Sequence, residues 1–341
     1  MSMVGDLVVA KFYPLMDRFL PKGVALKIKL VFCVLHGDWQ FCNFCSEDLA
    51  VGLSESAAEE KLAKLLSGLD AESADLVKRL VGRIALLCRM RHSLLLKPSS
   101  FFWEEELAEQ RRWARELPAL ASKYKLPETP VEVVAFHNGM TLLPPAAINY
   151  LARKDFLDVG AYVGDSAVVF MEYGPRKVYS FDISTRNKAK YLATMEANHL
   201  STEKYEFVLA AVGDKDGGEM SFADTGAGDT NLGTSGSSKA PACTLDSFAA
   251  AKGLDVGLVK FDVEGFGLQA TRGMVETLKR HRPVLLLSIY HNSDEFFEIK
   301  PFIEALGLGY KFKLAKLNPF HLVGELTLLG YPGELAEKGD R

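Results

Sequence analysis

The amino-acid sequence predicts an α/β protein with a doubly wound parallel sheet, preceded by a mostly helical domain. First, strand and helix patterns alternate after residue 131, whereas mostly helical patterns precede it. Second, the segment FLDVGAYVGDSAVVF at 156–170 has an apolar strand that turns through Gly160 and Gly164 into a helix. Third, the next strand pattern, KVYSFD, ends in Asp182. Because ligands bind beyond the carboxyl ends of the strands in such sheets, we expect the site there.

The N-terminal part is separated from the rest at 122–131, where Pro127 and Pro130 bracket a polar stretch. Before this boundary, leucines at helical spacing follow a Ser-Glu-Ser start, and similar patterns continue. We expect helices at 54–69, 72–90 and 103–121. The predicted domains are a helical domain at 1–130 and an α/β domain at 131–341. The helical part has no comparable glycine turn for a ligand. We therefore expect it to select an acceptor substrate or a binding partner.

The α/β part divides into short segments of alternating type. Apolar runs rich in β-branched residues predict strands, and periodic segments predict helices between them. The two C-terminal runs are separated by Asn318-Pro319-Phe320 and predict an antiparallel hairpin. Residues 225–238, rich in glycine and serine, predict a mobile loop near the site. The expected strands are 156–159, 177–182, 205–212, 256–262, 283–290, 311–317 and 321–329, and the expected helices are 164–173, 185–199 and 267–281.

The glycine turn indicates the class of cofactor. A dinucleotide-binding GxGxxG motif would need glycines at Tyr162 and Asp165, so a pyrophosphate would meet side chains where it needs bare backbone. An acid at the end of the second strand, Asp182, can accept hydrogen bonds from both ribose hydroxyls of an adenosine ligand. An adenosine bound without a diphosphate indicates S-adenosylmethionine.

Residues 244–291 carry further motifs. TLD at 244–246 precedes KFDVEG at 260–265, which is followed by Gly273 and by a strand that begins at Arg282-Pro283. Together with DVGAYVGD at 158–165, this order resembles the FkbM family of S-adenosylmethionine-dependent methyltransferases over about 131–341. The chain departs from the family pattern at FDIS, where Phe-Glu-Pro is usual, and at Gly267, where a second glutamate commonly follows EGxE.

The resemblance implies a Rossmann-like methyltransferase sheet and an S-adenosylmethionine site. It places Asp158 and Gly160 along the methionine part of the cofactor, Asp182 at the ribose and the Val212 region beside the adenine. It also implies an O-methyltransferase that acts on a hydroxyl of a sugar or similar secondary metabolite. The cofactor-binding residues expected on this basis are Asp158, Gly160, Ala161, Tyr162, Gly164, Asp165, Asp182, Ile183 and Val212.

Methyl transfer to oxygen needs alignment of the acceptor with the sulfonium and a base for its proton. Asp262, Glu264 and His291 are the candidates at neighbouring strand ends. We expect His291 to be the base, because its ordinary pKa is nearest to neutrality, and Asp262 to orient it or bind the acceptor. The alternative is that these groups only cap helices and turns.

We also considered magnesium held by Asp262 and Glu264. We expect these two side chains to point to opposite faces of their strand, which argues against a metal at this site, but the sequence leaves open whether a base or a metal assists the reaction. Two other functions stay open at this point: a catalytically silent methyltransferase fold that acts as a binding module, and a nicotinamide-dependent oxidoreductase. The first is suggested by Gly267, whereas the second lacks the phosphate glycines and a hydride-transfer motif.

The remaining features give weaker indications. Cys33, His36, Cys42 and Cys45 form an array that can bind zinc, but the apolar residues between them favour a buried segment. Arginines between 79 and 91, with His92, favour a solvated helix face over a basic patch. The net charge of −4 argues against nucleic acid as a partner. We expect no signal peptide and no membrane span, and the five cysteines suit a cytoplasmic location. The sequence leaves the oligomeric state open.

Overall fold

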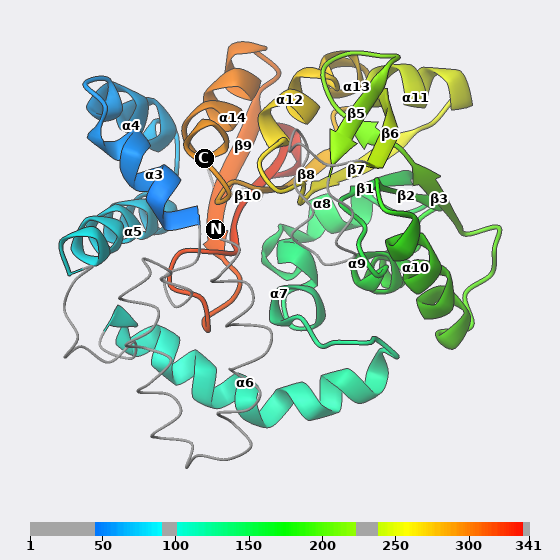
Figure 1. Ribbon diagram of the computed structural model, residues 1–341, viewed down its shortest axis with the longest axis horizontal. Coiled ribbons are helices and arrows are strands. Elements are labelled where there is room, and N and C mark those ends of the chain that lie inside the picture. Colours follow the sequence, from blue (N-terminus) through cyan, green and yellow to red (C-terminus); the bar gives the residue numbers. More distant parts are fainter. Residues whose placement is uncertain (1–44, 91–100, 223–237, 337–341) are drawn as a thin grey trace.

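The computed structural model describes residues 45–90, 101–222 and 238–336 and contains a seven-stranded sheet at its centre (Figure 1). The strand order is β3-β2-β1-β7-β8-β10-β9. The five strands from β3 to β8 are parallel, and β10 is antiparallel to both of its neighbours. This confirms the doubly wound sheet with a C-terminal antiparallel hairpin. The strands are β1 (Asp155–Val159), β2 (Lys177–Asp182), β3 (Tyr205–Leu209), β7 (Val256–Phe261), β8 (Val284–Ser288), β9 (Tyr310–Lys316) and β10 (Leu326–Pro332).

Helices cover both faces of the sheet, and each face has its own apolar core. One core joins α3, α4, α5 and α11 to α14 to the sheet. The other joins α7 to α10, together with the end of α6, to the opposite face. The helices are α3 (Cys45–Ser54), α4 (Ala58–Leu66), α5 (Ala71–Met90), α6 (Glu104–Lys123), α7 (Val131–Val134), η3 (His137–Leu142), α8 (Pro145–Tyr150), α9 (Asp165–Phe170), η4 (Met171–Tyr173), α10 (Thr185–Ala197), α11 (Leu245–Lys252), α12 (Gly267–Arg272), α13 (Val275–His281), α14 (Ser293–Ala305) and η5 (Gly333–Leu335).

The structure corrects the predicted elements in three places. The expected strand 205–212 leaves the main sheet at Ala210, and its end becomes β4 of a small sheet ordered β4-β6-β5. The expected helix 267–281 is interrupted at Gly273, where a side chain would overlap the carbonyl oxygen of Gly213. The expected hairpin turn at 318–320 is longer, because β10 begins only at Leu326. The small sheet consists of β4 (Ala211–Val212), β5 (Glu219–Phe222) and β6 (Ser238–Cys243).

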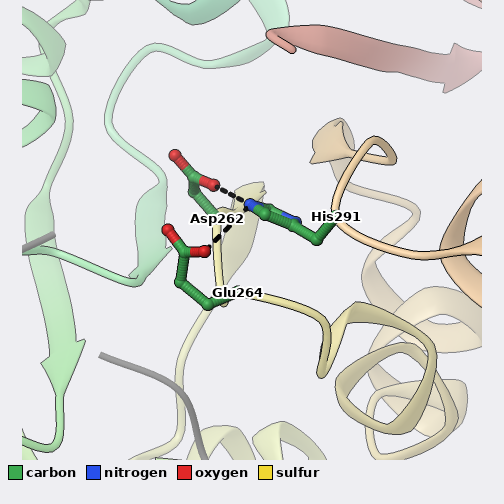
Figure 2. Close-up of side chains that lie close together, drawn as sticks. All are labelled: Asp262, Glu264 and His291. Atoms are coloured by element: carbon green, nitrogen blue, oxygen red, sulfur yellow. Dashed lines mark ion pairs between the residues drawn. The ribbon is translucent and has the colours of Figure 1, made fainter. Parts of the chain in front are cut away.

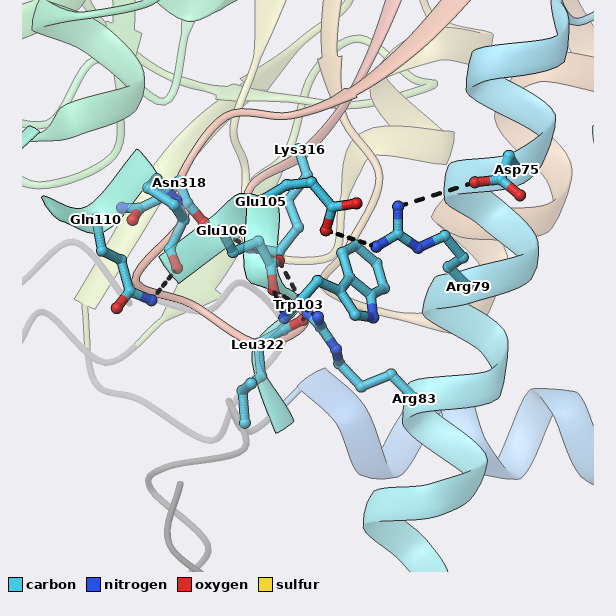
Figure 3. A network of polar contacts seen from close by, with 11 residues as sticks. Asp75, Arg79, Arg83, Trp103, Glu105, Glu106, Gln110, Lys316, Asn318 and Leu322 are labelled. Carbon is cyan, nitrogen blue, oxygen red and sulfur yellow. Dashed lines mark hydrogen bonds and ion pairs between the residues drawn. The ribbon is translucent and has the colours of Figure 1, made fainter. Parts of the chain in front are cut away.

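The N-terminal helices pack directly on the α/β part. Figure 1 shows α3, α4 and α5 beside α14 and β9, and apolar residues of these helices belong to one core with the sheet. A polar network also joins α5 and the start of α6 to the connection between β9 and β10 (Figure 3). At its centre the buried Arg83 pairs with Glu106, donates to the Leu322 carbonyl and stacks on the Trp103 ring. Residues before 131 are thus held against the loop that leads into β10.

Two other expectations fall partly outside the described residues. Cys33, His36 and Cys42 lie outside them, as do Arg91, His92 and most of the glycine- and serine-rich segment at 225–238. The side chains of Cys45 and Arg89 are likewise not described. Among the described helices, none has the length and apolar character needed to cross a membrane.

Candidate active site

A pocket of about 480 Å³, counting its open mouth, lies beyond the carboxyl ends of β1, β2 and β7. The strand order reverses between β1 and β7, so this is the switch point where doubly wound sheets bind ligands. Six of the predicted site residues line the pocket: Gly160, Asp182, Ile183, Val212, Asp262 and Glu264. Asn187 also lines it, which sequence reasoning missed although it follows Asp182 by little more than one helical turn.

Gly160 allows β1 and β7 to approach each other at the floor of the pocket. Its φ is +82°, and a Cβ atom at this position would overlap the carbonyl oxygen of Asp262. Its own carbonyl accepts a hydrogen bond from Lys260 Nζ at 2.8 Å. Gly160 is therefore needed for the close contact of two strand ends as well as for the turn itself.

Asp182 connects the two sides of the pocket. One carboxylate oxygen accepts from the Tyr162 backbone N–H at 3.0 Å, and the other accepts from the Ser184 N–H at 2.8 Å. The Asn187 amide lies 3.3 Å from both oxygens. Burial raises the pKa of Asp182, although these hydrogen bonds oppose the shift. These four contacts use the roughly four lone-pair sites of a carboxylate, so a ligand hydroxyl would replace the longer contacts from Asn187.

Asp158 has a different position from the one expected. Its side chain is fully buried and does not line the pocket. It accepts from the Ser180 hydroxyl at 3.3 Å and lies 3.5 Å from Lys260 Nζ. Burial raises the pKa of Asp158, and the charge of Lys260 counteracts that rise. Asp158 and Lys260 therefore form a buried pair beneath the glycine turn.

The other turn residues shape the pocket from behind. Ala161 is fully buried, and Gly164, with φ +84°, faces the side chains of Tyr191 and Met195. Burial raises the pKa of Asp165 to about 6, with the Lys260 charge opposing the shift. Tyr162 contributes its backbone N–H to Asp182. Since Gly164 faces side chains and the Tyr162 amide is engaged, the turn has no phosphate cradle of the dinucleotide type.

The three predicted catalytic residues lie together at the rim of the pocket (Figure 2). His291 Nε2 is 3.1 Å from Asp262 Oδ1 and 3.8 Å from Glu264 Oε2. The expectation that the two carboxylates point to opposite faces is wrong. Residues two apart on an extended strand share a face, so alternation by itself places both carboxylates on one side. β7 ends at Phe261 and Glu264 has φ +48°, and both side chains point toward the imidazole (Figure 2).

Glu295 orients His291 from the other side. The buried Glu295 carboxylate lies 2.8 Å from His291 Nδ1, so that nitrogen carries the proton it donates. Burial by itself would lower the pKa of His291, but the charge of Glu295 and the contact with Asp262 raise it well above its usual value. Sequence reasoning assigned the orienting role to Asp262. The available signal was His291 and Glu295 four residues apart at the start of a helix.

Glu295 also explains the departure at Gly267. Its second carboxylate oxygen accepts from the Gly267 backbone N–H at 2.7 Å. A Cβ atom at Gly267 would lie 2.7 Å from that oxygen, which is too close. The space that a side chain at position 267 would need is thus occupied by the carboxylate of Glu295 from α14.

Comparison with known proteins agrees with this geometry. The family model described as the methyltransferase FkbM domain matches residues 158–312. Residues 158–312 are a methyltransferase FkbM domain. This family indicates S-adenosylmethionine as the cofactor. A search of the curated proteins found no match.

One solved structure shows the same fold over most of this chain. The methyltransferase FkbM from Methylobacillus flagellatus KT has 13% identity and a TM-score of 0.57, covering 95% of this chain and 77% of its own. At 13% identity, this structural similarity shows a shared fold and nothing further. An O-methyltransferase from Bacillus cereus in complex with SAH has 14% identity and a TM-score of 0.37, covering 74% of this chain and 99% of its own. That second likeness is too weak to support an argument.

A second, polar pocket of about 260 Å³, counting its opening, lies beside the first. Asp262 lines both pockets, and Glu132, Lys260, Glu325 and Thr327 also line the second. Burial raises the pKa of Glu132 to about 7, and it raises the pKa of Glu325 well above its usual value. Two carboxyl groups that hold their protons readily thus face a cavity next to Asp262.

The Glu132 pKa leads to a test of stability. Its folded value of about 7 exceeds its usual 4.5, so its contribution to stability is fully present below pH 4.5 and is lost as the pH rises to about 7. Glu132→Gln copies the protonated form and keeps an oxygen for the 3.0 Å bond from Asn318. We expect the variant to be more stable than the wild type by roughly 1–3 kcal/mol at pH 8.5, with the difference shrinking toward pH 4.5. Urea unfolding at both pH values measures this difference in stability. A difference that does not change with pH would contradict the prediction.

Proposed function

We propose that the protein transfers the methyl group of S-adenosylmethionine to a hydroxyl of a small polar acceptor, such as a sugar or a similar secondary metabolite. The observation that carries the proposal is the place of Asp262, which lines both the cofactor pocket and the adjoining polar pocket. An acceptor in the polar pocket would present its oxygen to the methyl group beside Asp262, Glu264 and His291. In-line displacement depends on such positioning.

The reaction needs a proton acceptor as well as alignment. The acceptor oxygen forms a bond to the methyl carbon while the carbon–sulfur bond breaks, and that electron pair stays on sulfur, which becomes a neutral thioether. An alcohol is almost fully protonated at neutral pH, so its proton must leave as the new bond forms. We assign this proton to the cluster of Asp262, Glu264 and His291. Because His291 Nδ1 is engaged by Glu295, only Nε2 faces the reacting groups.

Two alternatives receive less support from the site. The nicotinamide-dependent oxidoreductase would need a phosphate cradle, which the turn between Gly160 and Gly164 does not provide. The silent binding module was suggested by the missing glutamate at Gly267. Since Glu295 places a carboxylate directly beside Gly267, the departure by itself is weak support for a lost activity.

Incubation with methyl-labelled S-adenosylmethionine and a panel of polyhydroxylated and amine acceptors tests the proposed chemistry. We expect the label on acceptor oxygen, and NMR of the product distinguishes a methoxy group from an N-methyl group. Label found only on nitrogen would contradict the oxygen acceptor, while binding of S-adenosylmethionine without any transfer would favour the silent module.

Asp182→Ala tests the assignment of the cofactor pocket. We expect it to weaken S-adenosylmethionine binding by about 1–3 kcal/mol, because it removes an ionised acceptor for the ribose hydroxyls and the bond to Tyr162. Calorimetric titration measures the change. Asp214→Ala is the matched control, since Asp214 is an exposed acid only two residues beyond the pocket-lining Val212. Equal affinity of the folded Asp182 variant and the control would place the adenosine elsewhere.

A further inference from the structure

Three potential metal-ligand atoms converge at the rim of the cofactor pocket. Asp262, Glu264 and His291 each direct one atom toward a common volume, and these atoms all lie within 4.8 Å of one another (Figure 2). Among the residues that the structure describes, one group of three such side chains has its ligand atoms this close together, and it is this one. Imidazole nitrogen and carboxylate oxygen are both ligands of divalent first-row transition metals.

Two of these atoms are buried and unsatisfied. The His291 side chain is only 3% exposed, and its Nε2 has no hydrogen-bond partner in the described part of the chain. Asp262 Oδ1 is also buried without such a partner, and it lies 3.1 Å from His291 Nε2. Buried polar atoms are nearly always satisfied in native proteins, so two that face each other call for a bound species between them.

The surroundings of His291 match those of a metal-bound histidine. Such a histidine usually donates its second ring N–H to a carboxylate, which fixes the tautomer and the ring orientation. Glu295 accepts from Nδ1 at 2.8 Å and is itself held by the Gly267 amide. The arrangement leaves Nε2 directed at Asp262 and Glu264, where a cation would take the place of its proton.

We propose that Asp262, Glu264 and His291 bind a divalent transition-metal cation such as Mn²⁺. Two ligand atoms about 2.1 Å from one ion and at right angles to each other lie about 3.0 Å apart, which agrees with the 3.1 Å between Asp262 Oδ1 and His291 Nε2. Glu264, at 3.8 Å from Nε2, completes the set after a small side-chain rotation. The mixed set of one imidazole and two carboxylates favours Mn²⁺ or Zn²⁺ over Mg²⁺ or Ca²⁺.

The place of the site suggests what the cation does. Asp262 and Glu264 also line the cofactor pocket, so a cation that they bind would border the space where donor and acceptor would meet. A metal-bound hydroxyl loses its proton more readily and is fixed in position. This chemical role rests on the proposed methyl transfer, whereas binding of the cation does not.

Titration of the full-length, chelator-treated protein with MnCl₂ tests the site. We expect one Mn²⁺ per chain by calorimetry and electron paramagnetic resonance, with pulsed spectra that show coupling to an imidazole nitrogen. Asp262→Asn and His291→Ala should weaken binding by more than about 100-fold, and His291→Ala should abolish the nitrogen coupling. Glu295→Gln should weaken it by about 10–100-fold, because it only orients the ligand.

Glu132→Gln is the matched control for these variants. Glu132 lines the adjoining pocket but is not one of the three ligands, so its Mn²⁺ affinity should equal that of the wild type. The proposal is overturned if the wild type binds neither Mn²⁺ nor Zn²⁺, or if folded His291→Ala binds Mn²⁺ as the wild type does. Assays with S-adenosylmethionine separate the two proposals. Full transfer in the presence of chelator would contradict only the chemical role of the cation, while Mn²⁺ binding without S-adenosylmethionine binding would contradict only the proposed function.

Discussion

His291→Ala is expected to lower turnover by about two to four orders of magnitude while S-adenosylmethionine affinity stays nearly intact. The substitution removes the ring that faces Asp262 and Glu264 and leaves the Glu295 carboxylate buried without its imidazole partner. The effect should fall on catalysis because His291 does not line the cofactor pocket. Single-turnover rates and calorimetric titration measure the two quantities separately.

A histidine at the other end of the sheet is the control for that experiment. His281 ends α13 and lies 3.8 Å from Asp255, which precedes β7, whereas His291 follows β8. His281→Ala should therefore retain turnover. Asp262→Asn should also be damaging, but its loss should not add fully to that of His291→Ala, because the two side chains act on the same reacting groups. Wild-type turnover in folded His291→Ala would remove His291 from the catalytic assignment.

The strand ends of the site could be predicted because parallel strands bring their carboxyl ends to one edge of a sheet. Asp182, Asp262 and Glu264 each follow a recognisable apolar strand, and all three line the cofactor pocket. The roles within the site were harder to predict. Glu295 lies inside a helix, one turn after His291. The hydrogen bond between them does not change the spacing of apolar residues, so a reading of hydrophobic patterns could not reveal it.

Period-2 alternation was sufficient to predict that Asp262 and Glu264 share a face, because residues two apart on an extended strand point to the same side. The expectation that they point to opposite faces misapplied that rule. The backbone conformation beyond the strand end was harder to predict: β7 ends one residue before Asp262, and Glu264 has a positive φ. Non-glycine residues in this conformation are uncommon, so the sequence gives no reason to expect one at a glutamate.

The N-terminal helices were predictable individually, but their packing was not. Leucine spacing predicted helices near α4 and α5, whereas the residues that receive their apolar faces are more than 200 positions away on β9 and α14. Arg83 was interpreted as part of a solvated helix face because charged residues surround it in the sequence. Its side chain is instead 2% exposed, since Glu106, Trp103 and the Leu322 carbonyl enclose it.

That enclosure makes Arg83→Ala the substitution with the largest expected loss of stability, about 3–5 kcal/mol. It leaves Glu106 with Lys316, at 3.2 Å, as its remaining cation, and it removes the donor of the buried Leu322 carbonyl. Urea unfolding should show a lower midpoint at an unchanged slope, which identifies a loss of stability instead of a change in the surface exposed.

Arg79→Ala provides the matched control for Arg83→Ala. Arg79 lies one helical turn earlier on α5, stacks on the same Trp103 ring at 4.0 Å and pairs with Glu105 at 3.0 Å. Both of its charged partners, Glu105 and Asp75, are exposed, so water replaces these interactions at little cost and we expect a loss below about 1 kcal/mol. Equal losses in the two variants would mean that stacking on Trp103, and not the buried pair with Glu106, holds the N-terminal helices to the loop before β10.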